Sequence, residues 1–114
     1  MDLTGPHVLG ADVSGEVVTI GPRVTRISEG DRVVVNPRIT CMQCRYCQSN
    51  QSEYCSSAGM VGSAIKGGYA EYVVVPATNA FPIPDDLSYV QAASLPTVFM
   101  PSWNILIRLS LIHI

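Results

Sequence analysis

Short apolar runs separated by glycine and proline turns make up most of the chain. The stretch from Val13 to Ile20 is rich in β-branched residues, and the turn sequence "GPRV" follows it. This pattern predicts a strand that enters a tight turn. The segment "EGDRVVVNP" repeats the arrangement, with a turn at Gly30 and a buried strand from Val33 to Val35.

Two further strands are predicted in the second half of the chain. Glycines 67 and 68 form a turn before an apolar stretch from Tyr69 to Val75, and a shorter strand is expected near Ala80 to Ile83. Several short strands separated by glycine and proline turns favour a mainly β (α+β) fold. A compact β-barrel or sandwich fits this pattern better than alternating βαβ units.

From Ser88 onward the apolar residues recur at helical spacing. The segments "SYVQAASL" and "TVFMPSWNILIRL" predict two helices, with Ser88 as the N-cap of the first. Pro101 lies well inside the second pattern and has no backbone N–H, so we expect that helix to begin near Pro101 or to kink there. Trp103 is expected in the core.

Composition places the chain among small globular proteins and limits its partners. Of its 114 residues 47% are apolar, and the net charge of −2 argues against nucleic acid as a partner. Apolar runs fall far short of the ~20 residues that span a bilayer, so no membrane partner is expected. The N-terminus carries no secretion signal, and a cytoplasmic, reducing compartment is the expectation.

All four cysteines lie within "CMQCRYCQSNQSEYC", at Cys41, Cys44, Cys47 and Cys55. Two-residue gaps let neighbouring thiolates bend around one ion, and a short loop can bring in the fourth. Four thiolates leave no open position for water or substrate. The spacing therefore predicts a structural Zn²⁺ site that stabilises a loop poor in hydrophobic residues.

Other uses of the four thiols remain open at this point. Two disulfides would require an oxidising compartment. An iron–sulfur cluster also uses four thiolates, but the fourth cysteine of the similar bacterial ferredoxin pattern precedes proline, and here Ser56 follows Cys55. A redox C-x2-C pair would need a βαβ setting, which the pattern does not predict.

The order of several motifs resembles the medium-chain dehydrogenase/reductase family, which includes zinc-binding alcohol dehydrogenases and quinone oxidoreductases. These motifs are "PHVLGADVSGEVVTIGPRV", "GDRVVV", the cysteine cluster, "GGYAEYVVVP", "IPDDLSYVQAASLP" and "TVFMPSW". The resemblance implies a GroES-like β-barrel with a zinc lobe at 41–55. In intact members this domain accompanies a Rossmann domain that binds NAD(P), and hydride passes between the nicotinamide and an alcohol, carbonyl or quinone-type substrate. A small-molecule substrate and a homo-oligomer are implied for the intact enzyme.

Two positions depart from members that carry a catalytic zinc. Such members usually read G-H-E where this chain has Gly10, Ala11 and Asp12, and they usually place a cysteine ligand where this chain has Thr97. Alanine cannot bind a metal, and threonine is a poor zinc ligand. Asp12 and Thr97 remain candidates for the catalytic pocket, and Thr97 also for cofactor contact. Alternatively, Asp12 caps a turn and Thr97 caps a helix.

The 114 residues contain no G-x-G-x-x-G fingerprint, so the chain is expected to be a fragment that lacks its Rossmann domain. We expect a truncated GroES-like domain over residues 1–86 and helices that lead toward the cofactor domain over 87–108. Residues 109–114, "LSLIHI", resemble the translation of a transposase end used in library preparation, and a non-native tail is expected there. The fragment alone should be inactive. The alternative is a stand-alone, zinc-stabilised β-barrel that binds a partner protein.

Overall fold

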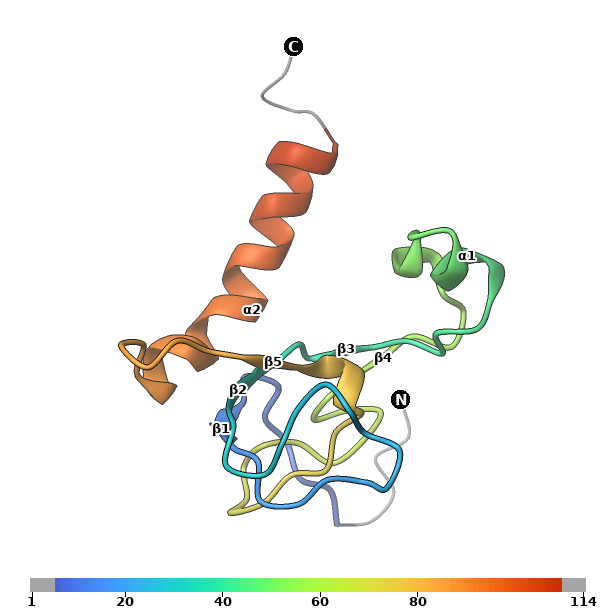
Figure 1. Ribbon diagram of the computed structural model, residues 1–114. Coiled ribbons are helices and arrows are strands. Elements are labelled where there is room, and N and C mark those ends of the chain that lie inside the picture. The colour runs from blue at the N-terminus through green and yellow to red at the C-terminus, as the bar shows by residue number, and fades with distance from the viewer. Residues whose placement is uncertain (1–5, 110–114) are drawn as a thin grey trace.

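Two small antiparallel sheets and one long helix form the computed structural model, which describes residues 6–109 (Figure 1). The larger sheet has the order β1 (Ser14–Glu16), β2 (Arg32–Val35) and β5 (Ala80–Pro82). Val34 of β2 lies opposite Ser14 on one side and Phe81 on the other. The structure is mainly β with helix at the C-terminal side, as the pattern predicts.

The core lies against one face of this sheet. Burial alternates along β2, where Val33 and Val35 are buried and their neighbours are not. Val33 packs with Ile27 and Ala80, and four half-buried residues surround them: Val17, Ile20, Val24 and Ala77. Gly30 has a φ of +89° in the turn that returns the chain to β2, and its N–H donates to the Val17 carbonyl at 2.8 Å. The predicted turn at Gly30 is thus present, and glycine suits it because L side chains disfavour this conformation.

The first predicted strand is much shorter in the structure. It covers Ser14–Glu16 and not the whole stretch from Val13 to Ile20. The Val17 N–H donates to the Asp31 carbonyl at 2.9 Å, and beyond this bond the partner chain has already turned at Gly30. The ladder therefore ends where its partner ends, whatever the β propensity of the residues that follow.

The predicted strand from Tyr69 to Val75 is wrong. Gly67, Gly68 and Tyr69 donate to the carbonyls of residues 8–10 at 2.7–2.9 Å, but residues 70–75 make no backbone hydrogen bond within the described chain. A hollow of about 720 Å³ lies between this segment and residues 13–20. No strand lies close enough to pair with this apolar segment.

The second sheet carries the cysteine lobe, which we define as residues 41–55. Strand β3 (Arg38–Ile39) pairs with β4 (Gly59–Met60), and the lobe lies in the connection between these two strands. It contains α1 (Arg45–Gln48) and a 3₁₀ turn, η1 (Ser52–Tyr54). A second 3₁₀ turn, η2 (Ala77–Asn79), leads into β5.

Helix α2 (Tyr89–Trp103) begins on the sheet and then extends away from it (Figure 1). The predicted N-cap is confirmed, because the Ser88 hydroxyl accepts from the Gln91 N–H and the Gln91 side chain accepts from the Ser88 N–H. Ala92 is fully buried, and the Ser14 hydroxyl donates to the Tyr89 carbonyl at 2.5 Å. The first half of α2 is thereby fixed to β1.

The structure has one continuous helix where the sequence predicts two. Pro96 and Pro101 both lie inside α2, and a π-helical turn, η3 (Asn104–Arg108), continues it. Each proline lacks an N–H, so each removes one hydrogen bond without ending the helix. Trp103 is 64% exposed, so its predicted place in the core is wrong. Of the predicted non-native tail, residues 110–114 lie outside the described residues.

Candidate functional site

The cysteine lobe gathers its four thiols from three short local structures. Cys41 follows β3, Cys44 is the N-cap of α1, Cys47 lies within α1 and Cys55 ends η1. Met42 adopts a φ of +58°, which turns the chain between the first two cysteines. Each two-residue gap therefore spans about one turn, and the thiols meet at the centre of the lobe.

The sulfur geometry fits one tetrahedral ion. The Sγ atoms of Cys44 and Cys47 lie 3.5 Å apart, those of Cys41 and Cys55 3.6 Å, and those of Cys41 and Cys47 3.9 Å. All four Sγ atoms lie within 4.8 Å of one another. Zn–S bonds of ~2.3 Å in a tetrahedron place sulfurs about 3.8 Å apart. The four cysteines are thus positioned for a zinc site, and all four are free thiols rather than disulfides.

The pKa values of two of the thiols are shifted in opposite directions. Backbone N–H groups of Gln43 and then Cys44 donate to Cys41 and lower its pKa to about 6. Burial raises the pKa of Cys47 to about 11, and side-chain hydrogen bonds from Cys44 and Cys55 act in the same direction. At neutral pH Cys41 is a ready thiolate, whereas a metal ion must displace a proton from Cys47.

The lobe has little apolar material to hold it together. Cys55 is the one buried residue between positions 41 and 55. The rings of Tyr46 and Tyr54 pack at a centroid distance of 5.8 Å, and the Arg45 guanidinium lies 4.6 Å from the Tyr46 ring. Such surface contacts are weak, so a bound ion would supply most of the folding energy of this lobe.

The structure brings together Asp12 and Thr97, the two candidates for the catalytic pocket. The Thr97 hydroxyl donates to the Asp12 carboxylate, although 85 positions separate them in sequence. Both residues are exposed. Thr97 lies in the middle of α2, so its alternative interpretation as a helix cap is wrong. The Asp12 carboxylate accepts from this helix.

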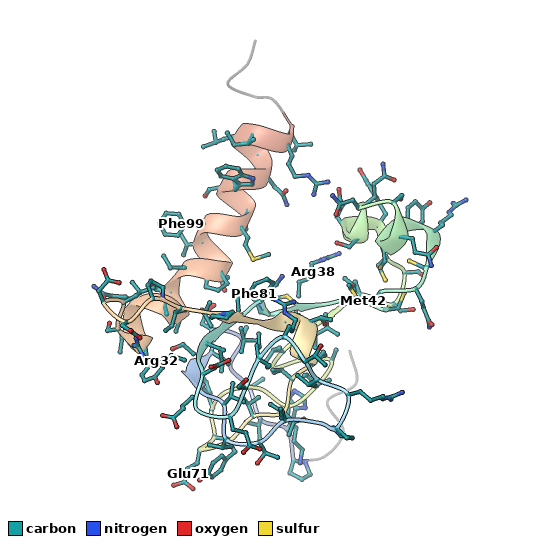
Figure 2. All side chains as sticks on the ribbon, viewed as in Figure 1. Arg32, Arg38, Met42, Glu71, Phe81 and Phe99 are labelled. Atoms are coloured by element: carbon teal, nitrogen blue, oxygen red, sulfur yellow. The ribbon has the colours of Figure 1, made fainter. Side chains whose placement is uncertain are left out.

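A hollow between α2 and the cysteine lobe, here called the α2 groove, has a volume of about 1060 Å³. Strand β3 and the Asn79 region form its floor, α2 and η3 form one wall, and the lobe forms the other. Its lining is mostly apolar, with Met60, Met100 and Trp103 beside Thr97, Arg38 and Glu53. Figure 2 shows Arg38 between the helix and the lobe.

Sequence reasoning missed Arg38 and Asn79. Asn79 is only 7% exposed, and its amide donates to the carbonyls of Asn36 and Arg38 at 2.8 and 2.7 Å. Its own carbonyl accepts from the Asn36 N–H at 2.8 Å. No motif marks these residues, because their importance depends on contacts between segments more than 40 positions apart.

A family match identifies the domain. Residues 2–85 match the family model described as the alcohol dehydrogenase GroES-like domain. The chain belongs to this family. An L-threonine 3-dehydrogenase from Shewanella woodyi is 43% identical over 99 residues, which make up 87% of this chain and 28% of that protein.

Solved alcohol dehydrogenases share the GroES-like fold of this chain. An NAD-dependent alcohol dehydrogenase superposes with a TM-score of 0.87 at 41% identity, over 90% of this chain and 30% of that one. A cobalt- and zinc-bound thermostable alcohol dehydrogenase from Pyrobaculum aerophilum gives 0.82 at 40% identity, over 90% and 31%. The chain thus spans less than a third of each of these relatives.

These matches confirm the predicted family and the GroES-like fold with its four-cysteine lobe. They do not favour the alternative of a stand-alone binding module. Within residues 6–109, no helix of this GroES-like domain is both long and apolar enough to cross a membrane.

Proposed function

We propose that this chain is the GroES-like part of a zinc-binding, NAD(P)-dependent dehydrogenase that transfers hydride between the nicotinamide and a small alcohol or carbonyl substrate. The observation that carries the proposal is the tetrahedral cluster of four thiols inside an alcohol dehydrogenase GroES-like domain. The names of the relatives, L-threonine 3-dehydrogenase and NAD-dependent alcohol dehydrogenase, support the reaction class. The nicotinamide cofactor would be held by a Rossmann domain outside these 114 residues.

The proposed zinc is structural, and Cys41, Cys44, Cys47 and Cys55 are its ligands. Four protein thiolates complete a tetrahedral shell, so neither water nor substrate can reach the ion. Its role is to hold the cysteine lobe, which has no apolar core. Because the lobe forms one wall of the α2 groove, an ordered lobe also keeps that groove in shape.

The test of the zinc site is metal content in the purified chain under reducing conditions. We expect one zinc per chain, and we expect Cys55→Ser to lose most of it, because a three-thiolate site leaves the ion open to chelators. Ser56→Ala changes the neighbouring exposed residue and should keep the full zinc content. Iron in place of zinc, or full zinc retention in Cys55→Ser, would contradict the assignment.

Asp12 and Thr97 are the proposed polar groups of the reaction pocket. Ala11 offers no ligand atom, and the hydroxyl of Thr97, which donates to the Asp12 carboxylate, is a poor zinc ligand. We therefore propose that hydrogen-bond donors, rather than a second zinc, polarise the substrate oxygen. A hydroxyl held by a carboxylate is a positioned group that can exchange this bond for one to a substrate.

The reaction is tested by comparing the 114-residue chain with a chimaera. In the chimaera, residues 6–108 replace the matching segment of the Shewanella woodyi protein, so that the domains of a full-length relative are restored. We expect alcohol-dependent reduction of NAD⁺ or NADP⁺ by the chimaera and none by the chain alone. Turnover by the chain alone, or an inactive chimaera with a full zinc content, would refute the proposed reaction.

A further inference from the structure

The guanidinium of Arg38 carries a charge in the α2 groove that no ion pair within residues 6–109 balances. Its Nη2 donates to the backbone carbonyl of Glu53 at 2.9 Å, and its Nε is buried without a hydrogen-bond partner. The ion pairs found over residues 6–109 are Arg108 with Glu53 and Arg32 with Asp85. A charged donor that has lost water and gained no acceptor favours binding of an anionic group beside it.

The backbone that carries Arg38 is held rigidly. Its N–H donates to the Asn36 side chain at 2.9 Å, and its carbonyl accepts from the buried Asn79 amide at 2.7 Å. In addition, Arg38 pairs with Met60 across the β3–β4 ladder. The backbone of Arg38 is therefore already ordered before a ligand binds. Binding to the guanidinium would cost little backbone entropy.

The charges around Arg38 favour a ligand with a single negative charge. Arg108, on the other side of the groove, is held by the Glu53 carboxylate at 3.3 Å and by the Asn50 carbonyl at 3.2 Å. Glu53 therefore balances Arg108, and among the charged residues that line the groove the uncompensated positive charge is that of Arg38. The planar fork of a guanidinium matches a carboxylate, whereas a phosphate dianion would remain half neutralised.

We propose that the α2 groove binds a small molecule that bears a carboxylate, with Arg38 as the residue that recognises it. This inference rests on the proposed dehydrogenase function and narrows its substrate class to hydroxy or amino acids that carry a secondary alcohol. The apolar side chains of Met100 and Trp103 would cover the carbon skeleton of the ligand. Thr97 also lines the groove and would face the ligand's alcohol oxygen. The groove volume of about 1060 Å³ is ample for such a ligand.

Binding is tested on the zinc-loaded chain by NMR, with the Nε–H signals of the arginines and the backbone amides as readouts. The probe is 3-hydroxybutyrate, which carries both a secondary alcohol and a carboxylate. Its methyl ester has the same alcohol without the charge, and inorganic phosphate at matched ionic strength tests for unselective anion binding. We expect saturable shifts of the Arg38 Nε–H and of groove amides with 3-hydroxybutyrate alone.

Variants decide whether Arg38 causes the binding. Arg38→Gln should weaken 3-hydroxybutyrate binding at least about tenfold, since a charge-assisted pair is lost. Arg38→Lys, which keeps the charge and loses the fork, should fall between Arg38→Gln and the unaltered chain. Arg23→Gln removes an exposed arginine from a turn outside the groove and should bind as the unaltered chain does.

Four results would overturn the carboxylate site: no binding of 3-hydroxybutyrate, equal binding of its ester, equal or tighter binding of phosphate, or unchanged affinity in Arg38→Gln. Zinc content measured in the same samples keeps the two proposals apart. A chain with one zinc that fails these tests overturns the carboxylate site and leaves the metal assignment standing.

Discussion

Asn79 joins two segments that the sequence alone does not connect. Its buried amide donates to the carbonyls of Asn36 and Arg38, and its carbonyl accepts from the Asn36 N–H. These bonds replace a strand pairing just before β5 and fix the floor of the α2 groove. One polar side chain thus supports both the sheet and the position of Arg38.

Replacement of Asn79 should be costly. Asn79→Ala would leave two carbonyls without their side-chain donor, and we expect a loss of about 2 kcal/mol or more in the free energy of unfolding. Urea denaturation followed by tryptophan fluorescence measures this loss. Thr25→Ala, at an exposed position outside the core, is the matched control. A midpoint for Asn79→Ala equal to that of the control would show that the Asn79 side-chain hydrogen bonds contribute little.

Zinc affinity should rise with pH. The metal binds thiolates, and Cys47, with its pKa raised to about 11 by burial, is protonated at neutral pH. As the pH rises, removing this proton costs less free energy. Cys41, with a pKa of about 6, becomes protonated only in mildly acidic solution. Competition with a chromophoric chelator of known pH dependence measures the trend. A zinc affinity that stays constant between about pH 6 and 9 would contradict it.

At the scale of elements, α2 is anchored at one end and exposed at the other. The capping box at Ser88, the buried Ala92 and the bond from Ser14 to Tyr89 hold its first half on the sheet. Its second half carries two prolines and exposes Phe99 and Trp103 by more than 60% each. Arg108 then bridges from η3 to the cysteine lobe through Glu53. The position of α2 on the sheet therefore depends mainly on the contacts of its N-terminal half.

The cap at Ser88 should contribute measurably to stability. Ser88→Ala removes the hydroxyl that accepts from the Gln91 N–H, which typically costs about 1 kcal/mol. Ser102→Ala is a control in the same continuous helix, because that hydroxyl bonds to the Val98 carbonyl near the junction of α2 and η3 and caps no helix start. We expect a lower thermal midpoint for Ser88→Ala and little change for Ser102→Ala. Equal shifts in both variants would contradict the role of the cap.

At the scale of the whole molecule, apolar surface is concentrated on an unpaired segment and on the second half of α2. Residues 70–75 make no backbone hydrogen bonds in the described structure, and Val74 and Tyr72 are 89% and 71% exposed. Exposed apolar segments with free backbone groups can pair with other chains. This segment is therefore the expected site of self-association at high concentration.

A charge in this segment should suppress self-association. Val74→Lys places a strongly hydrated group at an apolar residue that is 89% exposed, and it should lower the average mass measured by light scattering as concentration rises. Thr25→Lys adds the same charge at a remote exposed position, so it controls for net charge. Equal suppression by both substitutions would assign the effect to net charge rather than to this segment.

The sequence by itself determined the features that depend on neighbouring residues. The cysteine spacing predicted a site for one ion, Ser88 predicted the helix cap, Gly30 predicted a turn, and the order of motifs predicted the family. Each of these is encoded within about 15 residues or in the order of short motifs, so no long-range contact is needed to infer it.

Only the tertiary structure decided what depends on distant segments meeting. It showed that residues 70–75 have no strand to pair with, that α2 continues through Pro96 and Pro101, and that Thr97 reaches Asp12. It also placed Arg38, held by Asn79, in a groove between α2 and the cysteine lobe. The physical reason is that strand pairing, burial and the balance of a charge are properties of contacts across the fold, and local sequence patterns do not contain those contacts.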